Sequence, residues 1–158
     1  MSDEPVRAKP SVEQLQRYAD AFNRSTTLQF WGVRVHFPSQ DRVEVHLDKV
    51  RPEQRGGLGT DAINGGVLAA LFDLGLGCTP ALIDPTRRNA TIQLSMSFER
   101  PVRGDSMMVR AQIDNAGDTV LFSSAEALDA RGVVCARCQG VVRLSKRPWK
   151  TGDSPAVN

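Results

Sequence analysis

One apolar stretch, Asn64 to Cys78, constrains the fold of this chain more than any other. It reads NGGVLAALFDLGLGC. Its side chains leave almost no polar face, and a helix that is apolar on all sides is a buried helix. It is too short to span a bilayer, which needs roughly 20 apolar residues. The sequence therefore predicts one central buried helix that the rest of the chain must cover.

The predicted helix carries one charge, the carboxylate of Asp73. A lone carboxylate in apolar surroundings is costly to desolvate, so it needs a partner or a chemical role. The helix begins at Gly65 and Gly66, with Asn64 as the expected N-cap. Glycine at this place lets another backbone or a ligand approach free N–H groups at the positive end of the helix dipole. A polarised helix N-terminus is thus expected about two turns from a buried acid.

Length and charge limit the function classes. The chain has 158 residues, which favours a single domain, and its net charge of +2 is too small to indicate binding to nucleic acid or to a membrane. The first residues show no signal-peptide pattern, so we expect a cytoplasmic protein. Cys135 and Cys138 form a CxxC in a strand-like run, where these two positions point to opposite faces. We therefore expect no metal and no cofactor.

The segments around the central helix predict one further helix and six strands. Ser11 and Gln14 fit a capping box that begins an amphipathic helix. The segment from Val50 to Ile63 has no periodicity and is long enough for a functional loop. Alternating apolar and polar residues predict antiparallel strands at 33–37, 43–47, 91–98, 109–113, 119–128 and 133–144.

The strand at 91–98 has two predicted faces. Its apolar side chains are expected to face the core, and Thr91 is expected on the opposite, polar face. The order of elements favours an α+β domain in which a curved antiparallel sheet wraps one helix. We expect a lead and amphipathic helix at 1–26, the main domain at 27–145 and a C-terminal tail at 146–158. Because the core is small and the sheet edges are open, a dimer or a dimer of dimers is expected.

These features resemble the hotdog-fold thioesterases, and within them the phenylacetate-pathway and 4-hydroxybenzoyl-CoA thioesterase branch. The resemblance rests on NGGVLAALFDLGLG followed by TIQLSMSFERPVRG, and it covers about residues 28–144. It implies a hotdog fold and hydrolysis of acyl-CoA thioesters without a metal, at sites on a homodimer or homotetramer interface.

The resemblance also implies site residues. The N–H of Gly65 would polarise the thioester carbonyl, Asp73 would act as nucleophile or general base, and Thr91 would help to hold a water. Two positions depart from the family pattern, which has histidine where this chain has Asn64 and, in some members, asparagine where it has Leu58. Asn64 can donate or accept a hydrogen bond, but it cannot change charge near neutral pH.

Several assignments stay open at this point. Gly66 belongs to the expected substrate site, and the arginines Arg88, Arg100 and Arg103 are candidates for contacts with the phosphates of CoA, although each could be an ordinary surface arginine. The main alternative to a thioesterase is a hotdog protein that binds acyl-CoA or a small ligand without turnover. A purely structural dimer is a third interpretation.

Overall fold

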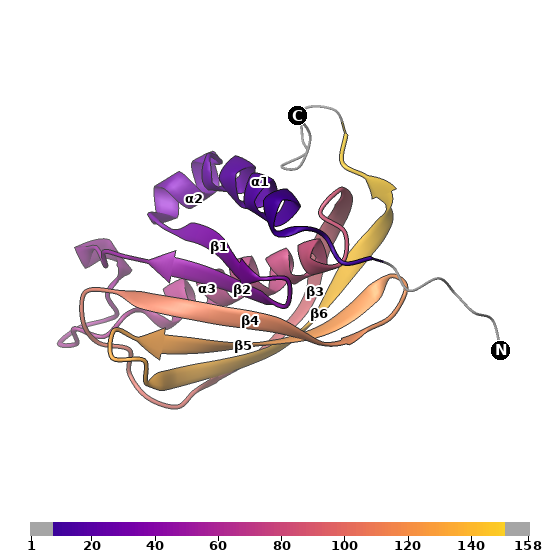
Figure 1. Ribbon diagram of the computed structural model, residues 1–158. Coiled ribbons are helices and arrows are strands. Elements are labelled where there is room, and N and C mark those ends of the chain that lie inside the picture. The colour runs from indigo at the N-terminus through magenta and orange to yellow at the C-terminus, as the bar shows by residue number, and fades with distance from the viewer. Residues whose placement is uncertain (1–7, 151–158) are drawn as a thin grey trace.

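The computed structural model describes residues 8–150 (Figure 1). Residues 1–7 of the expected lead and residues 151–158 of the expected C-terminal tail at 146–158 lie outside this range, and β6 extends into that tail as far as Pro148. The chain forms α1 (Val12–Asn23), α2 (Thr26–Trp31), β1 (Arg34–Ser39), β2 (Arg42–Leu47), the 3-10 turn η1 (Pro52–Gln54), α3 (Gly65–Cys78), the 3-10 turn η2 (Thr79–Leu82), β3 (Arg87–Phe98), β4 (Met107–Ala116), β5 (Val120–Asp129) and β6 (Val134–Pro148).

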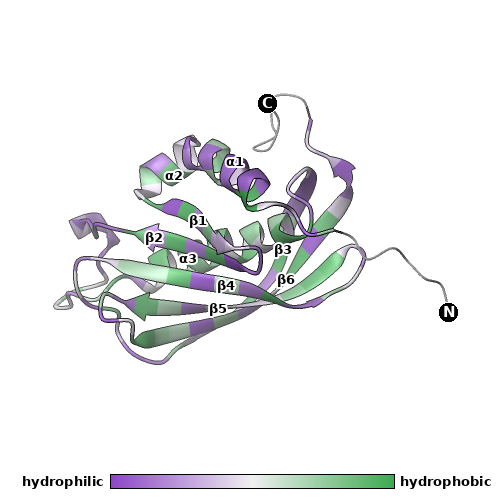
Figure 2. Ribbon diagram, in the orientation of Figure 1, coloured by the Kyte–Doolittle hydropathy of each residue, from purple (hydrophilic) through white to green (hydrophobic). Residues whose placement is uncertain are grey.

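The six strands form one antiparallel sheet in the order β1-β2-β4-β5-β6-β3, and this sheet curves around α3 (Figure 1). Leu71, Phe72 and Leu76 of α3 are fully buried in the core. The helix and sheet approach closely at Gly75, where an added Cβ would stand 3.1 Å from the Cγ1 of Val109. Figure 2 shows α3 as mostly hydrophobic. The predicted hotdog fold, with one long helix inside an antiparallel sheet, is confirmed.

Local hydrogen bonds explain where the helices begin. Ser11 caps α1 and forms the expected capping box with Gln14. The helix α2 was not predicted from the sequence. It follows the N-cap Ser25 and ends at Trp31, with Gly32 as the C-cap, whose φ of 68° lies in the left-handed region. This short helix forms because Ser25 accepts a hydrogen bond from the N–H of Leu28, which replaces one of the bonds missing at a helix start.

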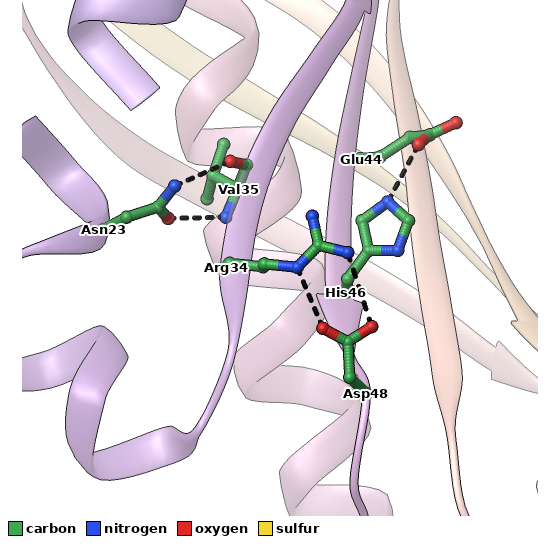
Figure 3. A network of polar contacts seen from close by, with 6 residues as sticks. All are labelled: Asn23, Arg34, Val35, Glu44, His46 and Asp48. Carbon is green, nitrogen blue, oxygen red and sulfur yellow. Dashed lines mark hydrogen bonds and ion pairs between the residues drawn. The ribbon is translucent and has the colours of Figure 1, made fainter. Parts of the chain in front are cut away.

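The free edge of β1 is covered by a side chain of α1. The amide nitrogen of Asn23 donates to the Val35 carbonyl at 2.9 Å, and its oxygen accepts from the Val35 N–H at 2.7 Å (Figure 3). Asn23 thereby takes the place of a neighbouring strand, which blocks edge-to-edge pairing at this position. The same view shows two polar pairs: Arg34 of β1 with Asp48, which follows β2, and His46 with Glu44 within β2, each at 2.8 Å.

The opposite edge strand, β3, differs from the prediction. It lies beside β6 alone, and a bulge interrupts their pairing between Thr91, opposite Val142, and Gln93, opposite Val141. The extra residue is Ile92, which was expected in the core but is 60% exposed. Phe98 at the end of the strand is also 55% exposed. A bulge shifts the alternation of side chains along a strand, so period two does not hold through residues 91–98.

The helical segment Gly65–Leu82, which joins α3 to η2, is longer than the sequence indicated. Its 18 residues are apolar enough, by length and composition, to cross a membrane. In the described part of the chain 61% of this segment is buried, because the sheet wraps it. This burial is the packing of a core helix inside a sheet.

Candidate active site

One face of α3 is left open by the sheet, which corrects the expectation of a helix buried on all sides. Gly65, Gly66 and Asp73 are exposed, and Ala69 and Gly77 between and after them are half-buried. These positions recur at three- and four-residue spacing, so they form one stripe along the helix. Asp73 is therefore not a buried acid within one chain, and it forms no ion pair with any residue of 8–150.

The N-terminus of α3 offers one free hydrogen-bond donor on the open face. The side chain of Asn64 accepts the N–H of Gly66 through Oδ1 at 2.7 Å, as expected for an N-cap. The N–H groups of Val67 and Leu68 both bond to the Asn64 carbonyl. The N–H of Gly65 has no acceptor among the described residues, and it lies at the positive end of the helix dipole. It can therefore donate to an oxygen that carries developing negative charge.

Thr91 lies against the helix and not on the polar outer face where it was expected. Its Oγ1 stands 3.4 Å from the point that a Cβ at Gly77 would occupy. Gly77 follows Asp73 by four residues, so the two positions share one face of α3. The bulge at Ile92 turns Thr91 inward, and it brings a hydroxyl to the stripe that carries Asp73.

Gly65 and Asp73 of one chain lie too far apart along α3 to act on the same thioester. They are eight residues apart, which corresponds to about 12 Å along a helix axis at 1.5 Å per residue. A base or nucleophile must come within about 3 Å of the atom that it attacks or deprotonates. One thioester carbonyl cannot meet the Gly65 N–H and the Asp73 carboxylate of the same chain together.

The cysteine thiols are not suited to act as nucleophiles. Burial raises the pKa of Cys78 to about 12 and that of Cys138 to about 11, with a smaller upward contribution from the Asp73 carboxylate in each case. Both thiols are therefore protonated at neutral pH, and only the thiolate is an effective nucleophile. Asp73 is left as the acidic or nucleophilic group on this stripe.

Comparison with known proteins identifies the family. A sequence model described as the thioesterase superfamily matches residues 61–136. A protein of Halobacterium salinarum, provisionally named an esterase, is 30% identical over 146 residues, which cover 87% of this chain and 94% of that protein. The chain belongs to the thioesterase superfamily.

Solved structures of this superfamily share the fold. A thioesterase-superfamily-related protein from Shewanella oneidensis superposes with a TM-score of 0.75 at 23% identity, covering 90% of this chain and all of its own. The Escherichia coli PaaI protein of the phenylacetic acid degradation operon gives a TM-score of 0.74 at 16% identity, covering 87% of this chain and 97% of its own. At these identities the likeness is evidence for the hotdog fold only.

The arginines predicted to bind phosphates lie at opposite ends of β3. Arg100 and Arg103 lie beyond its C-terminal end, where Arg103 pairs with Asp61 at 3.3 Å. Arg88 lies at the other end, where it lines a cavity with Arg143 and Arg147 of β6. No local sequence pattern indicates Arg143 and Arg147, because they follow Arg88 by 55 and 59 residues and only the pairing of β6 with β3 brings them beside it.

Proposed function

We propose that this member of the thioesterase superfamily hydrolyses acyl-CoA or aryl-CoA thioesters to the free acid and CoA. The observation that supports the proposal most is the open stripe of α3. It combines the N–H of Gly65 with the exposed carboxylate of Asp73, and neither group has a partner within residues 8–150. The Gly65 N–H would hold the carbonyl oxygen as it gains negative charge in the tetrahedral intermediate. The buried thiols are compatible with a reducing, cytoplasmic location.

Two chemical routes fit Asp73. As a general base, its carboxylate takes a proton from water while the water oxygen bonds to the carbonyl carbon. The C–S bond then breaks, and the CoA thiolate takes up the proton. As a nucleophile, the carboxylate forms an acyl–Asp73 anhydride as the C–S bond breaks and the CoA thiolate leaves. Water then cleaves the anhydride, which restores the Asp73 carboxylate, and the CoA thiolate takes up a proton from that water. Thr91, whose hydroxyl lies beside Gly77, would bind the water in either route.

We further propose that each site combines α3 helices from two copies of the chain. Gly65 and Asp73 are too far apart within one helix to act on one thioester. Ala69 is the midpoint between them in sequence, so a two-fold axis near Ala69 would place Asp73 of one copy opposite Gly65 of the other. The small side chain at Ala69 would allow two helices to approach closely.

A dimer should therefore be the active species. Wild-type protein is expected to be a dimer or larger in light scattering at micromolar concentration. Ile92→Glu should give a monomer with little activity, because Ile92 is 60% exposed on the open edge strand and a charge there opposes its burial in an interface. Val12→Glu is the matched control, since Val12 is 58% exposed on α1. A monomeric wild-type protein with full activity would contradict the two-copy site.

The proposed activity is tested with a panel of acyl-CoA and aryl-CoA thioesters. Hydrolysis of each is measured as the amount of free CoA thiol released. We expect turnover of at least one substrate class and no dependence on added metal. Absence of turnover across the panel, combined with tight binding of acyl-CoA, would instead favour the ligand-binding alternative.

One observation favours that alternative. In the structure, the Asn64 side chain occupies the N–H of Gly66, so Gly66 is not free to share an oxyanion with Gly65. Related thioesterases are expected from the sequence resemblance to have histidine at this position. A site with one donor binds a thioester carbonyl but stabilises its oxyanion less than a site with two donors.

A further inference from the structure

A cavity of about 440 Å³ lies on the sheet where β3 begins and β6 ends. Three of its lining residues are arginines: Arg88 from β3, and Arg143 and Arg147 from β6. The remaining lining residues are Asn89, Ala90 and Ser145. No carboxylate of residues 8–150 lines this cavity, whereas the side chains of Asn89 and Ser145 add neutral hydrogen-bonding groups.

Strand pairing explains why the arginines come together. Arg143 lies directly opposite Ala90, whose small side chain leaves room above the sheet. The neighbouring Arg87 turns the other way: it is 7% exposed, and its guanidinium donates to the backbone carbonyls of Ser145 and Leu144. Arg87 thereby fixes the end of β6 against β3, and Arg88, the next residue, stays exposed on the cavity side.

The three arginines lack ionic partners. None of them forms an ion pair with an acid within residues 8–150, and neighbouring like charges on a sheet destabilise each other. A bound anion would remove this repulsion. Seven of the other twelve arginines in residues 8–150 pair with acids: Arg17 with Glu13, Arg34 with Asp48, Arg55 with Asp105, Arg103 with Asp61, Arg110 with Glu126, Arg131 with Asp129, and Arg137 with Glu99 and Glu126.

We propose that Arg88, Arg143 and Arg147 form a binding site for a ligand with two or more phosphate groups. Guanidinium groups form paired hydrogen bonds with phosphate oxygens, and three of them around one cavity suit a pyrophosphate or a cluster of phosphates better than a single carboxylate. If the proposed function is correct, the nucleotide portion of CoA supplies such groups, and the site would favour CoA thioesters over thioesters without a nucleotide. A free nucleotide or polyphosphate has the same chemistry.

Binding is tested by calorimetry at low salt with CoA, inorganic pyrophosphate and pantetheine, which lacks the nucleotide. We expect wild-type protein to bind CoA and pyrophosphate more tightly than pantetheine. The double variant Arg143→Gln/Arg147→Gln should weaken both by about tenfold or more, the effect of losing charge-assisted hydrogen bonds. Wild-type affinity should fall as salt is raised, because salt screens exposed charges over about 8 Å at physiological ionic strength.

The matched control is Arg24→Gln, since Arg24 is an exposed arginine at the C-cap of α1 and the variant loses the same charge. Its affinities should equal those of wild type. Loss of pyrophosphate binding with unchanged CoA binding in the double variant would support the site and identify a free phosphate ligand as its occupant. Unchanged affinity for both ligands would overturn the proposal. These measurements need no turnover, so absence of hydrolysis would count against the proposed function alone.

Discussion

Asp73→Asn should lower the kcat for thioester hydrolysis by roughly 10²-fold or more, the scale of losing a general base. Asparagine keeps the shape of the side chain but cannot take a proton or attack a carbonyl. KM should change little if Asp73 acts mainly in the transition state. Because Asp73 is exposed within one chain and has no ion-pair partner in residues 8–150, the monomer fold should tolerate the change. Kinetics and a melting curve on the same variant measure both effects.

The melting curve separates catalysis from a structural role. If Asp73 pairs with an arginine of a second copy, Asp73→Asn leaves that arginine unpaired in the interface. The free energy of unfolding should then fall by about 3–5 kcal/mol, the scale for breaking a buried pair. The control is Asp20→Asn, an exposed acid on α1 that should leave both kcat and melting temperature unchanged. An Asp73→Asn protein as active and as stable as wild type would contradict both roles.

Gly140→Ala should destabilise the fold by about 3 kcal/mol, at the upper end of the range for overpacking. An added Cβ at Gly140 would stand 2.7 Å from the carbonyl oxygen of Gln93 and 3.2 Å from side-chain carbons of Leu76 and Leu94. The contact with Gln93 is to backbone, so it can be relieved only by moving β3. At roughly 2–4 °C per kcal/mol for a chain of this size, the melting temperature should fall by about 6–12 °C.

The Gly140→Ala variant should lose activity as well as stability, because the added methyl group displaces the bulge of β3 that turns Thr91 toward α3. The matched control is Gly57→Ala, since an added Cβ at Gly57 meets nothing within 4 Å. Removing one glycine from a loop reduces the entropy of the unfolded chain, so the control should be neutral or slightly stabilised. Equal melting temperatures for the two alanine variants would show that the close approach at Gly140 is not rigid.

Much of the fold could be predicted because its signals are local. Ser11 with Gln14 and Asn64 with Gly66 form the expected caps, since a cap depends on residues two or three positions apart. The turns between β4 and β5 and between β5 and β6 lie at NAGD (115–118) and DARG (129–132), whose Asn, Asp and Gly residues favour tight hairpins. The short helix α2 was missed because six residues are too few to establish a period of 3.6.

For the candidate site, the sequence led to a prediction of which residues belong to it but not of what surrounds them. The family resemblance selected Asp73, Gly65 and Thr91 as site residues, and this selection stays a prediction. Their surroundings differ from expectation: Asp73 is exposed, Gly66 is capped by Asn64, and Thr91 faces α3. Hydrophobicity alone could not reveal the open face of α3. Ala69 and Gly77 on that face are small apolar residues, and such residues are equally common in a buried core.

The apolar residues of α3 were sufficient to predict that the rest of the chain must cover this helix, because so many apolar side chains at helical spacing are stable only when removed from water. The side of α3 that stays uncovered depends on the order of the strands, which puts β3 at an edge of the sheet, and no local pattern encodes that order. The direction of Thr91 depends on a bulge, which period-two alternation does not encode. The meeting of Arg88 with Arg143 and Arg147 has the same origin: strand pairing joins residues that are distant in the chain, and no local pattern records that contact.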